Sequence, residues 1–151
     1  MESQTSLTTT RFGDVPIEMT EIVEFPWGVP GFAHLRRFVA LSTDDQPQFI
    51  WFQSVDDAAV ALPTADPWVW FPEYEARLPA YAIAALHLNE PDDYTVLCVV
   101  DPANENADMT MNLLAPIVVN LTTRRARQIM LEGSHYGVRA PIPQRVTAET
   151  V

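Results

Sequence analysis

The sequence predicts a mostly β protein, a compact antiparallel β-barrel-like single domain with one short helix. The chain has 151 residues, which suits one domain, and its apolar fraction of 48% is enough for a packed interior. Thirteen prolines leave few windows for a helix, because proline interrupts the helical hydrogen-bond ladder. The segments between the prolines are short and rich in Val, Ile, Phe and Trp, which favours strands.

Seven segments are expected to form strands. They are residues 38–41, 49–55, 60–63, 94–100, 110–114, 117–121 and 127–131. Asp44-Asp45-Gln46-Pro47 is expected to join the first two as a hairpin turn, and Asp56-Asp57 to join the second and third. Residues 49–52 are apolar on both faces of their strand. Such strands need cover on two sides, as in a closed sheet with flanking loops.

One helix is expected, over residues 80–88. Pro79 suits the start of a helix, and Pro91 follows its end. The chain is divided into a flexible N-terminal tail over residues 1–10, a barrel domain over residues 11–143 and a flexible C-terminal tail over residues 144–151. The protein is expected to be a monomer.

The charge of the chain is strongly negative, at −11, and all nine basic residues are Arg. Residues 1–120 hold four Arg and eighteen acidic residues, whereas residues 121–151 hold five Arg and two acidic residues. A surface of this sign repels nucleic acid and anionic membranes. From charge alone, a role in solubility is favoured over the alternative of attracting a basic protein. The N-terminus lacks the basic and apolar regions of a signal peptide, so a cytoplasmic location is expected.

No pattern of catalytic or metal-binding residues is present. His34, His87 and His135 are isolated from one another, and His87 is expected on the helix. The single cysteine, Cys98, lies in an apolar run and is expected to be a buried, unreactive thiol. With no phosphate-binding glycine loop and no nucleophile motif, the sequence predicts a protein that is not an enzyme and uses no cofactor.

Two clusters of aromatic residues stand outside the expected strands. One is residues 25–32 (Phe-Pro-Trp-Gly-Val-Pro-Gly-Phe), and the other is residues 68–74 (Trp-Val-Trp-Phe-Pro-Glu-Tyr). Aromatic side chains in loops either anchor a protein interface or plug the ends of a barrel, and plugging is favoured for any single residue. The second cluster lies between acidic residues, and apolar anchors with a charged rim are typical of a binding patch.

Six short strings follow one another along the chain. They are Phe25-Pro26-x-Gly28-x-Pro30-Gly31-Phe32, Phe52-Gln53-Ser54-Val55-x-Asp57, Phe71-Pro72-x-Tyr74, Met111-Asn112-Leu113-Leu114-Ala115-Pro116-Ile117-Val118-Val119-Asn120, Arg125-x-x-Gln128 and Tyr136-x-x-Arg139. Together they resemble the FliW family of flagellar assembly factors over residues 12–139. The string that ends at Asn120 is the most specific part of the resemblance.

The resemblance implies a compact antiparallel β-barrel-like fold, no enzymatic activity and two protein partners in the cytoplasm. These partners are flagellin and CsrA, a small RNA-binding repressor of translation. Flagellin occupies the protein until it is exported; the released protein then binds CsrA and relieves the repression of flagellin synthesis. An acidic surface suits this scheme, since an RNA-binding protein presents cationic surface.

The site residues expected from the resemblance fall into two groups. The expected partner-binding residues are Trp70, Phe71, Glu73, Tyr74 and Glu75, with Tyr136 and Arg139 as a second choice. The motif residues expected to serve either structure or interface are Gly28, Gly31, Phe32, Gln53, Ser54, Asn112, Pro116, Asn120 and Gln128. Replacing Phe71 and Tyr74 with Ala is expected to abolish partner binding without unfolding the protein.

Two other functions remain open from the residues alone. A barrel that binds a small molecule or acts as an enzyme would need a polar, ligand-sized cavity with perturbed titratable groups. A nucleic-acid-binding barrel of the OB type would need aromatic residues interleaved with basic ones, for which the sequence offers only Arg124, Arg125 and Arg127.

Overall fold

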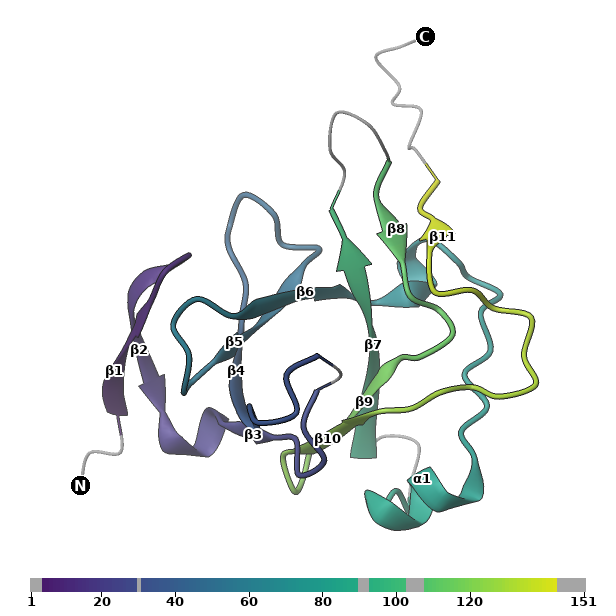
Figure 1. Cartoon of the computed structure of the whole chain (residues 1–151), viewed down its shortest axis with the longest axis horizontal. Helices are drawn as coiled ribbons and strands as arrows, with labels where there is room; N and C mark the ends of the chain where they lie inside the picture. Colours follow the sequence, from purple (N-terminus) through teal and green to yellow (C-terminus); the bar gives the residue numbers. More distant parts are fainter. Residues whose placement is uncertain (1–3, 30, 90–92, 103–107, 144–151) are drawn as a thin grey trace, which may run out of the picture.

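The computed structural model describes residues 4–29, 31–89, 93–102 and 108–143 (Figure 1). The expected C-terminal tail, residues 144–151, lies outside the described residues. The strands are β1 (Gln4–Thr9), β2 (Gly13–Glu18), β3 (Val23–Glu24), β4 (Arg37–Leu41), β5 (Ile50–Ser54), β6 (Ala61–Ala65), β7 (Tyr94–Asp101), β8 (Thr110–Met111), β9 (Ile117–Asn120), β10 (Arg125–Gln128) and β11 (Ala140–Pro141). The helices are the 3₁₀ helices η1 (Met19–Glu21) and η2 (Pro67–Val69) and the α-helix α1 (Ala80–Ala85).

Seven strands form a closed ring, in the order β7-β6-β5-β4-β3-β10-β9, and β9 pairs again with β7. Every pairing in the ring is antiparallel except that of β3 with β10, where Glu24 faces Arg125 in parallel register. β8 and β11 extend the sheet from β7 (Figure 1). The prediction of a mostly β, barrel-like fold with one short helix is therefore confirmed.

The interior of the ring is filled by apolar side chains. Phe25, Phe38 and Phe52 meet there, with ring centroids 5.1 Å apart for Phe25–Phe38 and 5.7 Å apart for Phe25–Phe52. The loop between β3 and β4, drawn in dark blue at the centre of Figure 1, adds Val29 and Leu35 to this cluster. Part of the first aromatic cluster thus plugs the barrel.

Two further apolar clusters cover the outside of the ring. Residues 49 and 65–78 pack with β7, β8 and residues 131–142 to form one of them, and α1 packs on β7 and β9 to form the other. The strands that contribute to both the interior and an outer cluster are apolar on both faces. In β9, Ile117 and Val119 face the interior, whereas Val118 faces α1.

The N-terminal prediction is wrong for residues 4–9. These residues form β1, which pairs with β2 in a hairpin of its own at the left of Figure 1. The hairpin is attached to the barrel where the Arg11 guanidinium lies 4.3 Å from the ring centre of Trp51 and Phe12 packs on the same ring. Repeated Thr residues look like a polar tail in the sequence, yet their branched Cβ atoms suit an exposed strand.

The expected elements also differ at their ends. α1 ends at Ala85, and His87 has a φ of 55°, so the chain leaves the helix before residue 88 and the exposed His87 is not a helical residue. This turn lets Leu88 pack beside Leu86 in the cluster under α1. β8 ends at Met111 because the amides of Leu113 and Leu114 bond to Gly137 instead.

β10 begins and ends earlier than expected. It starts at Arg125 and stops at Gln128, whereas the sequence predicts residues 127–131. The amides of Ile129 and Leu131 donate to the carbonyls of Pro116 and Leu114, outside the strand ladder. The apolar residues that suggested a strand there serve the outer clusters instead.

Candidate partner-binding surface

The second aromatic cluster forms a compact surface segment after β6. Its first turn is η2, where the Asp66 carboxylate accepts a 2.8 Å hydrogen bond from the Trp68 amide and caps the helix. The indole nitrogen of Trp68 then donates a 2.7 Å bond to the carbonyl of Tyr74. These two bonds fold residues 66–74 back on themselves.

The aromatic anchors expected in this segment face mainly inward. Tyr74 is only 4% exposed, and its hydroxyl donates a 2.7 Å hydrogen bond to the carbonyl of Leu113. Trp70 stacks on Phe49 and, like Phe71, is half-buried against the outer cluster. Tyr74 therefore belongs to the core, and its replacement by Ala would disturb the fold. The sequence predicts that replacing Phe71 and Tyr74 with Ala leaves the fold intact. The burial of Tyr74 does not fit that prediction.

The side chains presented to solvent are their neighbours. Trp68 is 37% exposed and Val69 is 54% exposed. Glu73 and Glu75 are exposed, as the sequence predicts for the rim of a binding patch. The composition of the segment does not show which of its aromatic residues are buried and which are exposed. The sequence therefore predicts Trp70 and Tyr74 as partner-binding residues, and not Trp68.

Tyr136, a second-choice residue, lies beside this segment. Its ring is 4.7 Å from that of Tyr74, and its hydroxyl accepts a 2.8 Å hydrogen bond from the Glu75 amide. Between the two segments is a surface depression of about 330 Å³, with Glu75, Arg77, Glu132 and His135 on its wall. We call the surface formed by residues 66–77 and 131–136 the acidic ridge.

The acidic ridge carries more negative than positive side chains. Its exposed acids are Asp66, Glu73, Glu75 and Glu132, and its only cation is Arg77, which forms an exposed ion pair with Glu75. Arg139, in contrast, lies on the wall of another depression, together with Asp101 and Asn112. The structure thus brings Tyr136 to the expected surface but not Arg139.

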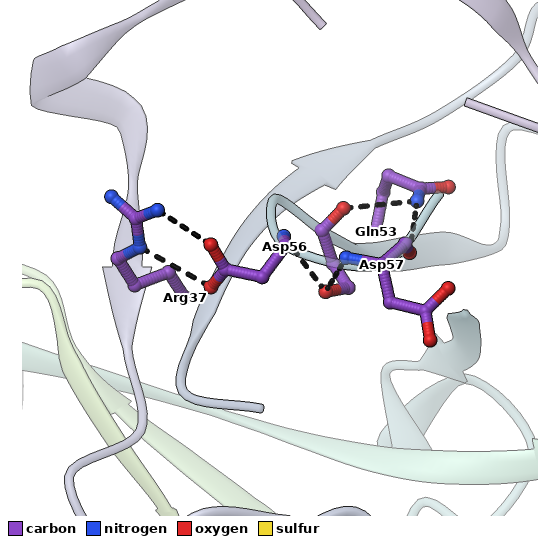
Figure 2. Close-up of polar contacts among 5 residues, drawn as sticks. Arg37, Gln53, Asp56 and Asp57 are labelled. Atoms are coloured by element: carbon purple, nitrogen blue, oxygen red, sulfur yellow. Dashed lines mark hydrogen bonds and ion pairs between the residues drawn. The ribbon is translucent and has the colours of Figure 1, made fainter. Parts of the chain in front are cut away.

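Gln53 and Ser54 fix the turn between β5 and β6, and Figure 2 shows how Gln53 lies beside Asp56 and Asp57 in this turn. The Ser54 hydroxyl accepts the amides of Asp56 and Asp57 at 3.1 and 2.9 Å, and the Gln53 amide nitrogen donates to the Ser54 carbonyl at 3.0 Å. Arg37 forms an ion pair with Asp56, and the hydrogen bond from its guanidinium lowers the pKa of the Asp56 carboxyl. Both motif side chains are fully buried, which favours the structural one of their two expected roles.

The polar residues of the most specific string also bond within the chain. The Asn112 carboxamide oxygen accepts the Ala115 amide at 3.0 Å, and Gln128 donates to the Ala115 carbonyl at 2.9 Å. Asn120 donates to the carbonyl of Leu86 at 2.6 Å. Pro116 is buried between them, and its carbonyl accepts the Ile129 amide. Side-chain bonding to backbone around Pro116 is what the sequence predicts for the two asparagines.

The first aromatic cluster is shaped by its glycines. Gly28 has a φ of +73°, and a Cβ at this position would lie 2.5 Å from the carbonyl oxygen of Ala33. Gly31 has a φ of +88°, and Phe32 is half-buried against the barrel interior. Trp27 stands out at 46% exposed, with the guanidinium of Arg127 lying 4.5 Å from its ring centre. No spacing rule in the sequence connects these two residues.

Neither a metal-binding cluster nor a membrane-spanning helix is found in the described residues. In the described residues, no group of three or more His, Cys, Asp or Glu side chains could hold a metal ion. Among the helices in the described ranges, none is long and apolar enough to cross a membrane. His34, His87 and His135 are all exposed.

Comparison with known proteins identifies the family. The family model described as FliW protein matches residues 6–142. The chain belongs to the FliW family. It is similar to the flagellar assembly factor FliW of Moorella thermoacetica, at 37% identity over 132 residues covering 87% of this chain and 84% of the relative. It is similar also to that of Geotalea uraniireducens, at 39% identity over 135 residues covering 89% and 82%.

Structural comparison agrees with the sequence. A crystal structure of the flagellar assembly factor FliW superposes with a TM-score of 0.85 at 30% identity, covering 95% of this chain and 100% of the other. The resemblance seen in the six strings is therefore confirmed. In this FliW-family barrel, the polar residues of those strings hold the backbone, whereas exposed residues beside them form the surface.

Proposed function

We propose that this chain binds flagellin in the cytoplasm and, once flagellin has been exported, binds CsrA and relieves its repression of flagellin translation. The observation that carries the proposal is the FliW match over residues 6–142, since the relatives are described as flagellar assembly factors. Such a protein couples the synthesis of flagellin to its secretion without performing a chemical reaction. Binding alone accounts for this role.

The chemistry of the motif residues supports a binding role. Five polar motif residues form side-chain hydrogen bonds to the backbone of the chain itself: Gln53, Ser54, Asn112, Asn120 and Gln128. A catalytic group has to be free to meet a substrate. The interior of the barrel, which a small-molecule carrier would need for its ligand, is occupied by the phenylalanine cluster.

We assign CsrA to the acidic ridge. An RNA-binding protein presents cationic side chains, and the ridge offers four exposed carboxylates around the exposed Trp68 and Val69. The carboxylates would steer the encounter, while the apolar side chains would supply the buried contact. Trp68 replaces Tyr74 as the aromatic anchor of this surface.

The test uses purified protein, flagellin monomer and CsrA in a binding assay at two salt concentrations. Exchanging Glu73 and Glu75 for Gln should slow association with CsrA by about tenfold at low salt, and less at high salt. The matched control, Asp44→Asn with Asp45→Asn, removes two exposed charges from the loop between β4 and β5, outside the acidic ridge, and should change association by less than about twofold.

Flagellin added to the complex should displace CsrA. Failure of the unmodified protein to bind either partner would refute the proposed function. Equal losses in the ridge variant and the control variant would leave the function standing and move the CsrA contact away from the acidic ridge.

A further inference from the structure

Two exposed aromatic side chains and the half-buried Arg127, from distant parts of the sequence, meet on the outside of the barrel. The guanidinium carbon of Arg127 lies 4.5 Å from the ring centre of Trp27 and 5.2 Å from that of Tyr81. Trp27 is 46% exposed and Tyr81 is 50% exposed. We call this group of three residues the aromatic clamp. It shares no residue with the acidic ridge.

Each member of the clamp stands on a well-packed element. Arg127 lies in β10, opposite Val118 of β9, and Tyr81 lies in α1, next to the fully buried Ala82. Trp27 precedes the tight turn at Gly28, whose amide donates a 2.8 Å bond to the carbonyl of Phe25. In Figure 1, α1 and β10 lie near each other at the lower edge of the barrel. The clamp is therefore held in place before any partner arrives, which lowers the entropy cost of binding.

The charge of Arg127 is not matched by a carboxylate within the described part of the chain. The ion pairs found there join Arg37 to Asp56, Arg77 to Glu75 and Arg125 to Glu24. Stacking between aromatic rings uses the faces of a guanidinium and leaves its in-plane N–H groups free for a carboxylate. The clamp thus combines a cation that needs an anion with two exposed apolar rings.

The charge around the clamp separates the two proposed partners. Arg124 and Arg125 precede Arg127, on a protein that is acidic elsewhere. A cationic RNA-binding protein is repelled by this group of Arg residues, whereas a segment that carries a carboxylate among apolar residues is attracted. The acidic ridge and the aromatic clamp therefore suit partners of opposite charge.

We propose that the aromatic clamp binds flagellin, through an apolar segment whose carboxylate pairs with Arg127, on a surface separate from the one that binds CsrA. This inference rests on the proposed function. It makes Trp27 and Tyr81 the apolar anchors and Arg127 the charge that sets the register of the segment. Flagellin bound at the aromatic clamp would then displace CsrA from a different surface of the same barrel, the acidic ridge.

The test measures binding of purified flagellin monomer and of CsrA to four variants of the full chain. Arg127→Gln, Trp27→Ala and Tyr81→Ala should each weaken flagellin binding by about tenfold or more. The matched control is Arg36→Gln, which removes the same charge from an exposed position outside the aromatic clamp and should change flagellin binding by less than about twofold. CsrA binding should stay within about twofold for all four variants.

Each outcome decides a different point. If the unmodified chain binds flagellin and the three clamp variants bind it equally well, the clamp is not the flagellin site, although the proposed function stands. If the unmodified chain does not bind flagellin, the proposed function fails and this inference fails with it. Equal losses of flagellin and CsrA in a variant with an unchanged circular dichroism spectrum would overturn the assignment to separate surfaces. Because Tyr81 is exposed on α1, its variant keeps the test valid even if Trp27→Ala misfolds.

Discussion

The side-chain amide of Asn120, at the end of β9, donates a 2.6 Å hydrogen bond to the carbonyl oxygen of Leu86, at the end of α1. The oxygen of the same side chain accepts the amides of Thr122 and Thr123 at 2.9 and 3.1 Å. One buried side chain thus fixes both the end of the helix and the turn that leads to β10. It also helps to position Tyr81 and Arg127, which stand on those two elements.

Replacing Asn120 with Ala is expected to lower the free energy of unfolding by about 2–3 kcal/mol, because the buried Leu86 carbonyl and two partly buried amides lose their partner. Urea denaturation followed by circular dichroism measures the change. The control is Asn89→Ala, at an exposed position after the helix, which should stay within about 0.5 kcal/mol of the unmodified protein. Similar losses in the two variants would contradict the role given to Asn120.

Tyr74 provides a second test, since it separates a core role from an interface role. Tyr74→Phe removes the hydroxyl that bonds to Leu113 and should cost about 1–2 kcal/mol in the free energy of unfolding. Tyr74→Ala removes the ring as well and should cost about 3–5 kcal/mol. Partner binding by the folded Tyr74→Phe protein should be unchanged. If the Tyr74→Phe variant lost partner binding but kept its stability, Tyr74 would have an interface role and not a core role.

The turn at residues 28–31 allows a comparison of two glycines. Gly28→Ala places a methyl group 2.5 Å from the Ala33 carbonyl oxygen and also strains a positive φ. Gly31→Ala strains a positive φ but meets open space. Thermal denaturation should therefore show a loss for Gly28→Ala that exceeds the loss for Gly31→Ala by more than about 1 kcal/mol. Equal losses of stability in the two variants would mean that the backbone at Ala33 moves away from the new methyl group at little cost.

Alkaline pH should destabilise the protein through two buried titratable groups, the Cys98 thiol and the Tyr74 hydroxyl. Burial raises the pKa of the Cys98 thiol from 9.0 to about 12, and burial also raises the pKa of the Tyr74 hydroxyl far above its usual value. Above about pH 9 for Cys98, and above about pH 10 for Tyr74, the unfolded chain releases a proton that the folded chain keeps, so each group lowers the free energy of unfolding by about 1.4 kcal/mol per pH unit. Denaturation at a series of pH values measures this slope.

Cys98→Ala is the control for that slope. It should remove the part of the slope that begins near pH 9 and leave the part due to Tyr74, which begins near about pH 10. The thiol should also resist a disulfide reagent in the folded state and react in urea, because Cys98 is fully buried. Rapid reaction of the folded protein, or an unchanged slope in the variant, would contradict this picture.

Patterns that are local in the sequence predicted the barrel well. The runs of Val, Ile and Phe that became β4, β5, β7 and β9 were found because their apolar residues follow one another without interruption. β1 and β2 are not predicted, since β1 is polar and rich in Thr and β2 contains Gly13 and Pro16, which are unfavourable in strands. β3 and β11 have only two residues each, which is too short for any periodic signal.

The candidate surfaces were harder to predict, because they depend on which side of the chain faces out. Composition marked residues 68–74 as an aromatic patch with acidic neighbours, and Glu73 and Glu75 are indeed exposed. It could not show that Tyr74 points inward to Leu113 while Trp68 remains at the surface. Contacts such as that of Trp27 with Arg127 join distant residues and exist only after the barrel has closed.

The parallel pairing of β3 with β10 also bears on how each molecule is made. Because Glu24 meets Arg125 across it, the ring of strands cannot close on a growing chain until residue 125 has left the ribosome. A long segment must be brought back before this pairing stabilises anything, so folding is expected to be slow for a protein of this size. The aromatic clamp, whose three residues come from both sides of this closure, is expected to form together with it. A cell that needs more of this protein thus waits for both its synthesis and its closure.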